Sequence, residues 1–130
     1  MKEETIEGFA KYRLEKAKDA LKSAQLLYKT NDLTGAINRA YYAIFYAIRA
    51  VLALERIDFK RHKDVLAYFN KKYVSTEIFP KQIGKKISQA QRAREDSDYD
   101  DEYEQSFEKT EEQIKTAEEI IRLVEKYMDK

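Results

Sequence analysis

Apolar residues recur every three or four positions along most of the chain, which is the period of an α-helix buried on one face. The clearest example is a row of alanines spaced by four, three, four and three residues: Ala36, Ala40, Ala43, Ala47 and Ala50. We expect this row on one face of a helix over residues 33–55. Small side chains there allow a second helix to approach closely.

Four more segments have the same period, so the sequence predicts an all-α fold. An amphipathic helix is expected over residues 5–29, and Asn31 and Asp32 offer an N-cap for the helix at 33–55. A third helix is expected over 61–73, and Pro80 suits the first turn of a fourth. We interpret Ser97 and the acidic cluster at 96–101 as a break and cap before a long final helix through 107–128. The predicted architecture is an up-and-down bundle of four to five helices.

Composition supports one helical domain over residues 1–130. Three glycines and one proline leave few turns, and 43% hydrophobic residues suffice for one core. The sequence has no cysteine, no apolar run long enough to span a membrane and no signal-peptide pattern. We therefore expect a cytoplasmic protein without membrane contact. Because no Gly-rich phosphate loop or metal-ligand pattern is present, we expect no cofactor and no metal.

The net charge of +1 conceals a strong division along the chain. Residues 1–55 carry a net charge of +2, residues 56–94 carry +8 and residues 95–130 carry −9. The basic segment at 56–94 could contact phosphates, or the acidic final helix could pack beside it and neutralise it. The cations concerned are Lys60, Arg61, Lys63, Lys71, Lys72, Lys81, Lys85, Lys86, Arg92 and Arg94.

Arg94 and His62 are the two residues of this segment with distinctive positions. Arg94 continues the apolar stripe of the fourth helix, so its guanidinium should lie on the buried side. It either pairs with an acid such as Asp98 or Asp100, or binds a phosphate in a cleft. His62 is the one histidine of the sequence and begins the third helix. Neighbouring cations favour its neutral form, which suits either acid–base chemistry or a helix cap.

A second face of the helix at 33–55 carries both cations and aromatic rings. Because the alanine row already supplies the seam within the chain, we expect this face at a homodimer interface or beside a cleft. Its residues are Arg39, Tyr42, Phe45, Tyr46 and Arg49.

Three stretches in this order resemble the HEPN family, named for higher eukaryotes and prokaryotes nucleotide-binding. They are Asn38 to Phe45 (Asn-Arg-Ala-Tyr-Tyr-Ala-Ile-Phe), His62-Lys63 at a helix start, and Arg92-Ala93-Arg94 ahead of Asp98-Tyr99-Asp100. The resemblance extends over nearly the whole chain. It implies a dimeric helical bundle, a small nucleotidyltransferase partner, toxin–antitoxin biology and RNA cleavage.

The family's catalytic motif is incomplete in this sequence. Active members resemble one another in an arginine followed, after four to six residues, by a histidine. Alignment on Arg94 places Tyr99 at the histidine position, and no histidine follows His62. A tyrosine with a pKa of about 10 is a poor general base near neutrality.

The sequence therefore favours a non-catalytic module that binds a nucleotide, RNA or a nucleotidyltransferase. Its candidate ligand-binding residues are Arg94, Tyr99, Arg92, His62 and Arg39. One alternative is a metal-independent ribonuclease that uses Arg94 with Tyr99 or His62. The other is a purely protein-binding partner.

Overall fold

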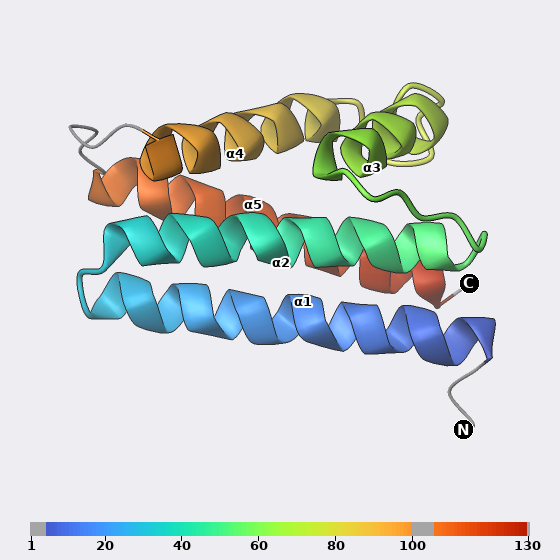
Figure 1. Cartoon of the computed structure of the whole chain (residues 1–130), viewed down its shortest axis with the longest axis horizontal. Coiled ribbons are helices and arrows are strands. Elements are labelled where there is room, and N and C mark those ends of the chain that lie inside the picture. Colours follow the sequence, from blue (N-terminus) through green and yellow to red (C-terminus); the bar gives the residue numbers. More distant parts are fainter. Residues whose placement is uncertain (1–4, 100–105, 130) are drawn as a thin grey trace.

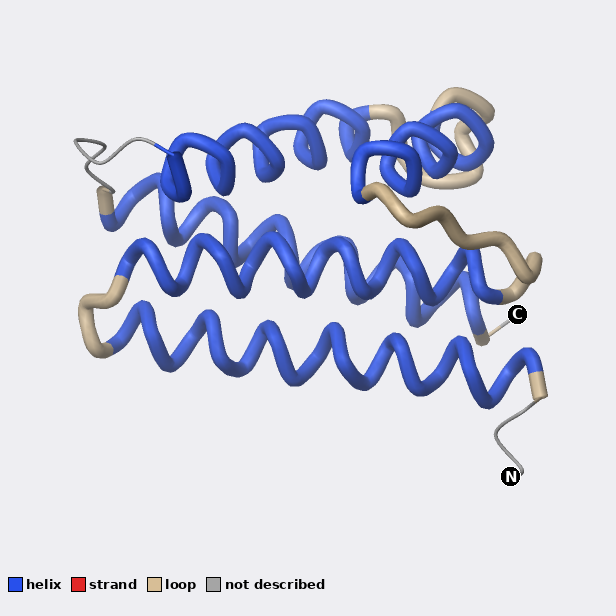
Figure 2. The backbone as a smooth tube through the Cα atoms, viewed as in Figure 1, coloured by secondary structure: helices blue, strands red, loops and turns tan. Residues whose placement is uncertain are grey.

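The computed structural model of the chain describes residues 5–99 and 106–129, and these residues are helical with no strand (Figures 1 and 2). The all-α prediction is confirmed. The elements are α1 (Ile6–Lys29), α2 (Leu33–Ala53), α3 (His62–Phe69), the π-helix η2 (Asn70–Val74), α4 (Gln82–Tyr99) and α5 (Phe107–Met128).

Helix α2 is the centre of the fold. It lies antiparallel to α1 and also contacts α3, α4 and α5 (Figure 1). All five alanines of the predicted row are 0% exposed, as the seam prediction requires. Tyr41, on the same helix, is 2% exposed and belongs to the main hydrophobic cluster with residues of α1, α3, α4 and α5. Side chains on α2 can therefore meet groups from several other helices.

Three helices begin at a side-chain cap. Thr5 accepts a hydrogen bond from the backbone N–H of Gly8 at the start of α1, at 3.0 Å. Asp32 accepts from Gly35 at 2.9 Å, which confirms the predicted cap of α2. Ser106 accepts from Lys109 at 3.0 Å and begins α5.

The predicted third helix changes its geometry in its second half. The α-helix ends at Phe69 and continues as a π-helix, in which the backbone N–H of Ser75 donates to the carbonyl of Asn70 at 2.8 Å. Periodicity alone does not distinguish the two forms over so short a run. Glu55, just beyond α2, holds this segment by accepting hydrogen bonds from Tyr68, Lys72 and Tyr73.

The predicted break at 96–101 is wrong at Asp96 and Ser97, because α4 continues through both to Tyr99; its last two residues, 100 and 101, lie outside the described residues. Arg94 donates to Asp98 four residues later at 3.1 Å, a pair that supports this last turn. Ser106 is the cap that the sequence assigned to Ser97. At the other end, α4 begins at Gln82, two residues after Pro80.

Candidate functional site

A cluster of arginines and aromatic rings lies where α2 meets the start of α3 and the last turns of α4. We call it the arginine–aromatic cluster. Arg94 of α4 contributes a cation, and His62 begins α3. Helix α2 contributes Arg39, Tyr41, Tyr42 and Phe45.

The guanidinium of Arg94 lies over Tyr41, with its Cζ 4.7 Å from the ring centroid and 6.0 Å from that of Tyr42. Its side chain is 17% exposed, which confirms the predicted position on the buried side of α4. The pair with Asp98 uses one terminal nitrogen at 3.1 Å. The buried Nε has no hydrogen-bond partner among the described residues. Arg94 thus retains donor capacity inside the cluster.

His62 lies on the same tyrosine. Its Nδ1 is 3.3 Å from the Tyr41 hydroxyl, and its ring stacks on Phe45 with the centroids 4.0 Å apart. Burial lowers the pKa of His62, and the charges of Arg94 and Arg49 lower it further. These causes favour the neutral imidazole at physiological pH, and they differ from the neighbouring cations Arg61 and Lys63 to which the sequence analysis attributed it.

Tyr41 contacts both candidate side chains, Arg94 and His62. Burial raises its pKa to about 12, although the nearby charge of Arg94 acts in the opposite direction. The phenol keeps its proton at neutral pH and can donate it to Nδ1 when His62 is protonated on Nε2. This tyrosine fixes the orientation of the imidazole beside Arg94.

Arg39 extends the cluster along α2. Its guanidinium lies 5.0 Å from the ring centroid of Tyr42 and donates to Asn38 at 3.3 Å. Tyr42 therefore has a cation from α2 and another from α4 near its ring, at distances typical of cation–π contact. Arg39 and Tyr42 are both partly exposed, so a ligand can reach them.

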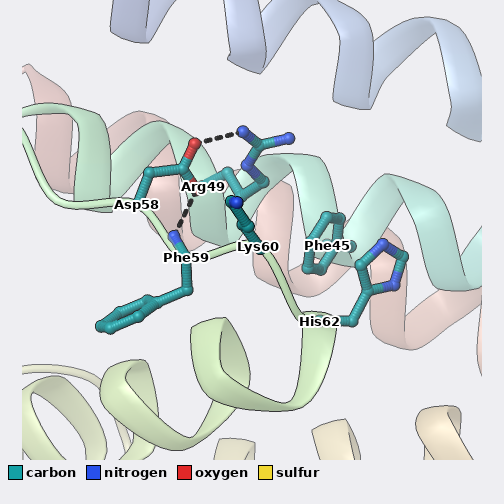
Figure 3. Close-up of a pocket in the computed structure, with 6 residues that line it drawn as sticks. All are labelled: Phe45, Arg49, Asp58, Phe59, Lys60 and His62. Carbon is teal, nitrogen blue, oxygen red and sulfur yellow. Dashed lines mark hydrogen bonds and ion pairs between the residues drawn. The ribbon is translucent and has the colours of Figure 1, made fainter.

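A pocket of about 400 Å³ lies beside the cluster, between the end of α2 and the start of α3 (Figure 3). In it the Asp58 carboxylate accepts a hydrogen bond from Arg49 at 2.5 Å and, through its other oxygen, from the backbone N–H of Phe59 at 2.9 Å. The residues that line it are Phe45, Arg49, Asp58, Phe59, Lys60 and His62. His62 and Phe45 belong to both the cluster and the pocket.

The structure does not bring all predicted site residues together. Arg92 is exposed on α4, and no contact places it in the cluster. Tyr99 ends α4, but its side chain lies outside the described part of the chain, as does Asp100.

The predicted dimer face stays a prediction, and its residues differ in exposure. Phe45 is only 3% exposed, because His62 stacks on its ring, and it lies beside the pocket, the other position that the sequence allowed for this face. Tyr42, Tyr46 and Arg49 remain partly exposed.

Sequence reasoning missed Tyr41 and Asp58 as site residues. Tyr41 belongs to the tyrosine pair of the family-like motif, but its central place depends on α3 and α4 crossing α2. Asp58 lies in the connection between helices, where no periodic pattern places its side chain.

Internal ion pairs neutralise part of the basic segment at 56–94. Lys86 reaches Glu119 of α5 at 2.6 Å, the kind of contact expected from an acidic final helix. Other cations pair locally, such as Lys72 with Glu55 at 2.6 Å. Lys60 and Lys63 form no ion pair with any described residue. A free positive charge therefore remains near the start of α3.

The described residues contain no group of side chains that could hold a metal ion. None of the described helices is both long enough and apolar enough to cross a membrane.

Comparison of the sequence with known proteins identifies relatives of this chain. The chain is 34% identical to the UPF0332 protein of Thermotoga maritima over 123 residues, covering 95% of this chain and 93% of that protein. It is 32% identical to a protein of Methanocaldococcus jannaschii named "Putative toxin MJ0142", over 67% of this chain and 59% of the relative. A second protein of that organism, named "Putative toxin MJ0605", is 29% identical over 66% of this chain and 64% of its own length.

The family model of the HEPN domain matches residues 10–127, which include every residue of the arginine–aromatic cluster. The chain therefore belongs to the HEPN domain family.

Proposed function

We propose that the chain is a non-catalytic HEPN module that binds RNA or a nucleotide through the arginine–aromatic cluster, within a toxin–antitoxin-like system. The observation that carries this proposal is Arg94, whose side chain is 17% exposed, whose guanidinium rests on Tyr41, and whose Nε has no hydrogen-bond partner among the described residues. A planar guanidinium suits a phosphate because it can donate two parallel hydrogen bonds.

Two guanidinium groups meet at the ring of Tyr42. Arg94 and Arg39 both lie against this ring, while Asp98 pairs with Arg94 and the charge of Glu95 acts on the neighbouring Tyr41. The partly exposed Tyr42 also offers an aromatic surface on which a base can stack. Phosphate and base binding would thus use adjacent side chains. Tyr99, the last residue of the same helix, remains a proposed ligand-binding residue.

We assign the toxin–antitoxin context from the relatives named as toxins, and the family resemblance adds a homodimer and a small nucleotidyltransferase as partners. The partly exposed face with Tyr42, Tyr46 and Arg49 is the proposed dimer contact. This face shares Tyr42 with the cluster, so a dimer would bring two such clusters toward one cleft.

A metal-independent ribonuclease is the second candidate, and the contact of His62 with Tyr41 favours it. A neutral imidazole held near an arginine has the two groups that RNA cleavage requires, a general base and a cation for the phosphate. In that case His62 would replace the histidine that the motif lacks at Tyr99.

The direct test compares Arg94→Ala with Arg92→Ala, which removes the same charge from the exposed side of the same helix. Affinity for a fluorescent single-stranded RNA hexamer should fall about 10- to 100-fold for Arg94→Ala, the loss expected for a charge-assisted hydrogen bond. Arg92→Ala should lower this affinity far less. If both variants lose the same affinity, Arg94 is not the specific binding residue. Wild-type binding that is absent or insensitive to salt would favour the purely protein-binding alternative.

A further inference from the structure

The pocket between α2 and α3 carries more positive charge than its own acid can balance. Asp58 is its one carboxylate, and that group already accepts hydrogen bonds from Arg13 at 3.2 Å and Arg49 at 2.5 Å. Lys60 adds a second cation to the lining, and it has no ion-pair partner among the described residues. Arg13 is not part of the lining, so one positive charge remains there after Asp58 is counted.

Arg49 also has a donor left over. Its Nη2 binds Asp58, but its buried Nε has no hydrogen-bond partner among the described residues. Its Cζ lies 5.7 Å from the centroid of Phe45, the ring on which His62 stacks. Figure 3 shows Arg49 and Lys60 on the same side of Phe45 and His62 as the Asp58 carboxylate. An anion in this pocket would meet both cations.

His62 connects this pocket with the arginine–aromatic cluster. Its ring lines the pocket, while its Nδ1 contacts Tyr41, on which Arg94 rests. The charges of both Arg94 and Arg49 act on its imidazole. The three stacked rings of Tyr41, Phe45 and His62 thus separate two cationic positions, one at Arg94 and one at Arg49 with Lys60.

We propose that the pocket lined by Arg49, Lys60 and His62 is a second phosphate subsite, so that the ligand is a single-stranded nucleic acid with phosphates on both sides of His62. This inference rests on the proposed function and narrows it. A mononucleotide carries its phosphate at one position and can occupy only one subsite. A strand carries a phosphate at every nucleotide and can occupy both.

The exposed ring of Phe59 fits this ligand. It is 39% exposed at the edge of the pocket and is directed away from His62 and Phe45 (Figure 3). A base that follows the second phosphate could stack there, because aromatic stacking accepts any base. The pocket thus offers a strand both a charged position and a stacking surface.

Lys60→Gln tests the second subsite, with Lys63→Gln as the control that removes the same charge three residues away and outside the pocket. The probes are hexamers of single-stranded RNA and DNA, and AMP, measured by fluorescence anisotropy and calorimetry. For the hexamers, Lys60→Gln should lower affinity about fivefold at about 0.1 M salt and reduce the salt slope by about 0.7. Affinity for AMP should be unchanged. Lys63→Gln should leave both hexamer and AMP binding near wild type.

Other outcomes separate this inference from the proposed function. If Arg94→Ala weakens both hexamer and AMP binding but Lys60→Gln matches Lys63→Gln, the second subsite is wrong and the proposed function stands. If Lys60→Gln weakens AMP binding as much as hexamer binding, the protein has one shared phosphate subsite and the proposal of two subsites is wrong. If wild-type protein binds no hexamer, both proposals fail together. Thermal melting of each variant checks that the fold is intact, which matters most for Arg94→Ala, because Lys60 and Lys63 are exposed and Arg94 is part-buried.

Discussion

Arg94 and His62, 32 positions apart in the sequence, meet on one side chain: the guanidinium of Arg94 lies 4.7 Å from the Tyr41 ring centroid, and His62 Nδ1 lies 3.3 Å from the Tyr41 hydroxyl. The sequence left open whether the fold brings these two residues together. Their meeting gives a guanidinium and a neutral imidazole a common support in the chain.

The first prediction concerns the pKa of His62. Burial, with Arg94 and Arg49 nearby, lowers it below the ordinary value of about 6.5. His62 is the one histidine in the sequence, so its imidazole NMR signal needs no assignment. The signal should titrate below pH 6.5, and Arg94→Gln should raise the midpoint. A wild-type midpoint at or above 6.5 would contradict the described surroundings of the ring.

The same shift predicts how stability depends on pH. Because the pKa of His62 is lower in the folded than in the unfolded chain, the unfolded state takes up a proton first as the pH falls. The free energy of unfolding should therefore decrease from about pH 6.5 downward, relative to a His62→Gln variant. Urea unfolding of both proteins at several pH values measures the difference. If the difference in the free energy of unfolding between wild type and His62→Gln does not change with pH, the protonation of His62 is not linked to stability.

A second prediction tests the anchor of the π-helix. Glu55 accepts hydrogen bonds from Tyr68 and Tyr73 and pairs with Lys72 at 2.6 Å. Glu55→Ala leaves the part-buried hydroxyls without this acceptor and should lower the free energy of unfolding by about 1–3 kcal/mol. The control is Glu111→Ala, which breaks an exposed pair and should cost less than about 0.5 kcal/mol. Equal, small losses would show that Glu55 does not anchor the segment.

A third prediction addresses the dimer. Tyr46 is partly exposed, with its ring centroid 5.8 Å from that of Tyr42, so Tyr46→Glu would place a charge in the proposed contact. We expect this variant to dimerise more weakly than wild type in sedimentation equilibrium. Leu26→Glu provides the control, because Leu26 is 63% exposed on α1 and outside that face. A wild-type monomer at high micromolar concentration would exclude the proposed interface.

A fourth prediction concerns RNA cleavage. The wild-type chain should cleave RNA far more slowly than a variant with the complete motif, because general acid–base catalysis contributes about 10²–10⁴-fold. Tyr99→His creates that motif and should increase the rate in metal-free buffer. Wild-type cleavage that is lost in His62→Ala would instead establish the ribonuclease candidate with His62 as its base. Cleavage lost in both Arg94→Ala and Tyr99→Phe would assign the role to the tyrosine.

The sequence predicted most of the helices because their apolar positions repeat over many turns. The row from Ala36 to Ala50 is buried as expected, and Asp32 caps α2. Local signals were less reliable. Ser97 and the acids around it resemble a break, yet the pair between Arg94 and Asp98 supports a continuing helix.

The candidate site could be predicted only in part. The apolar stripe of α4 placed Arg94 on the buried side, but the contact with Tyr41 depends on how α4 crosses α2. The position of Asp58 depends on the connection between α2 and α3, whose backbone turns at Arg56 with a positive φ of 59°. Hydrophobic periodicity does not encode such a turn, so the pocket could not be predicted from the sequence pattern.

The most direct test of phosphate binding at the arginine–aromatic cluster is the NMR signal of His62 in the presence of a single-stranded RNA hexamer. Phosphates beside Arg94 would offset the positive charge that disfavours the imidazolium, so the pKa of His62 should rise on saturation. This rise should be much smaller in Arg94→Ala at matched saturation. A saturated complex in which the chemical shift and the pKa of His62 stay at their free values would contradict binding at this cluster.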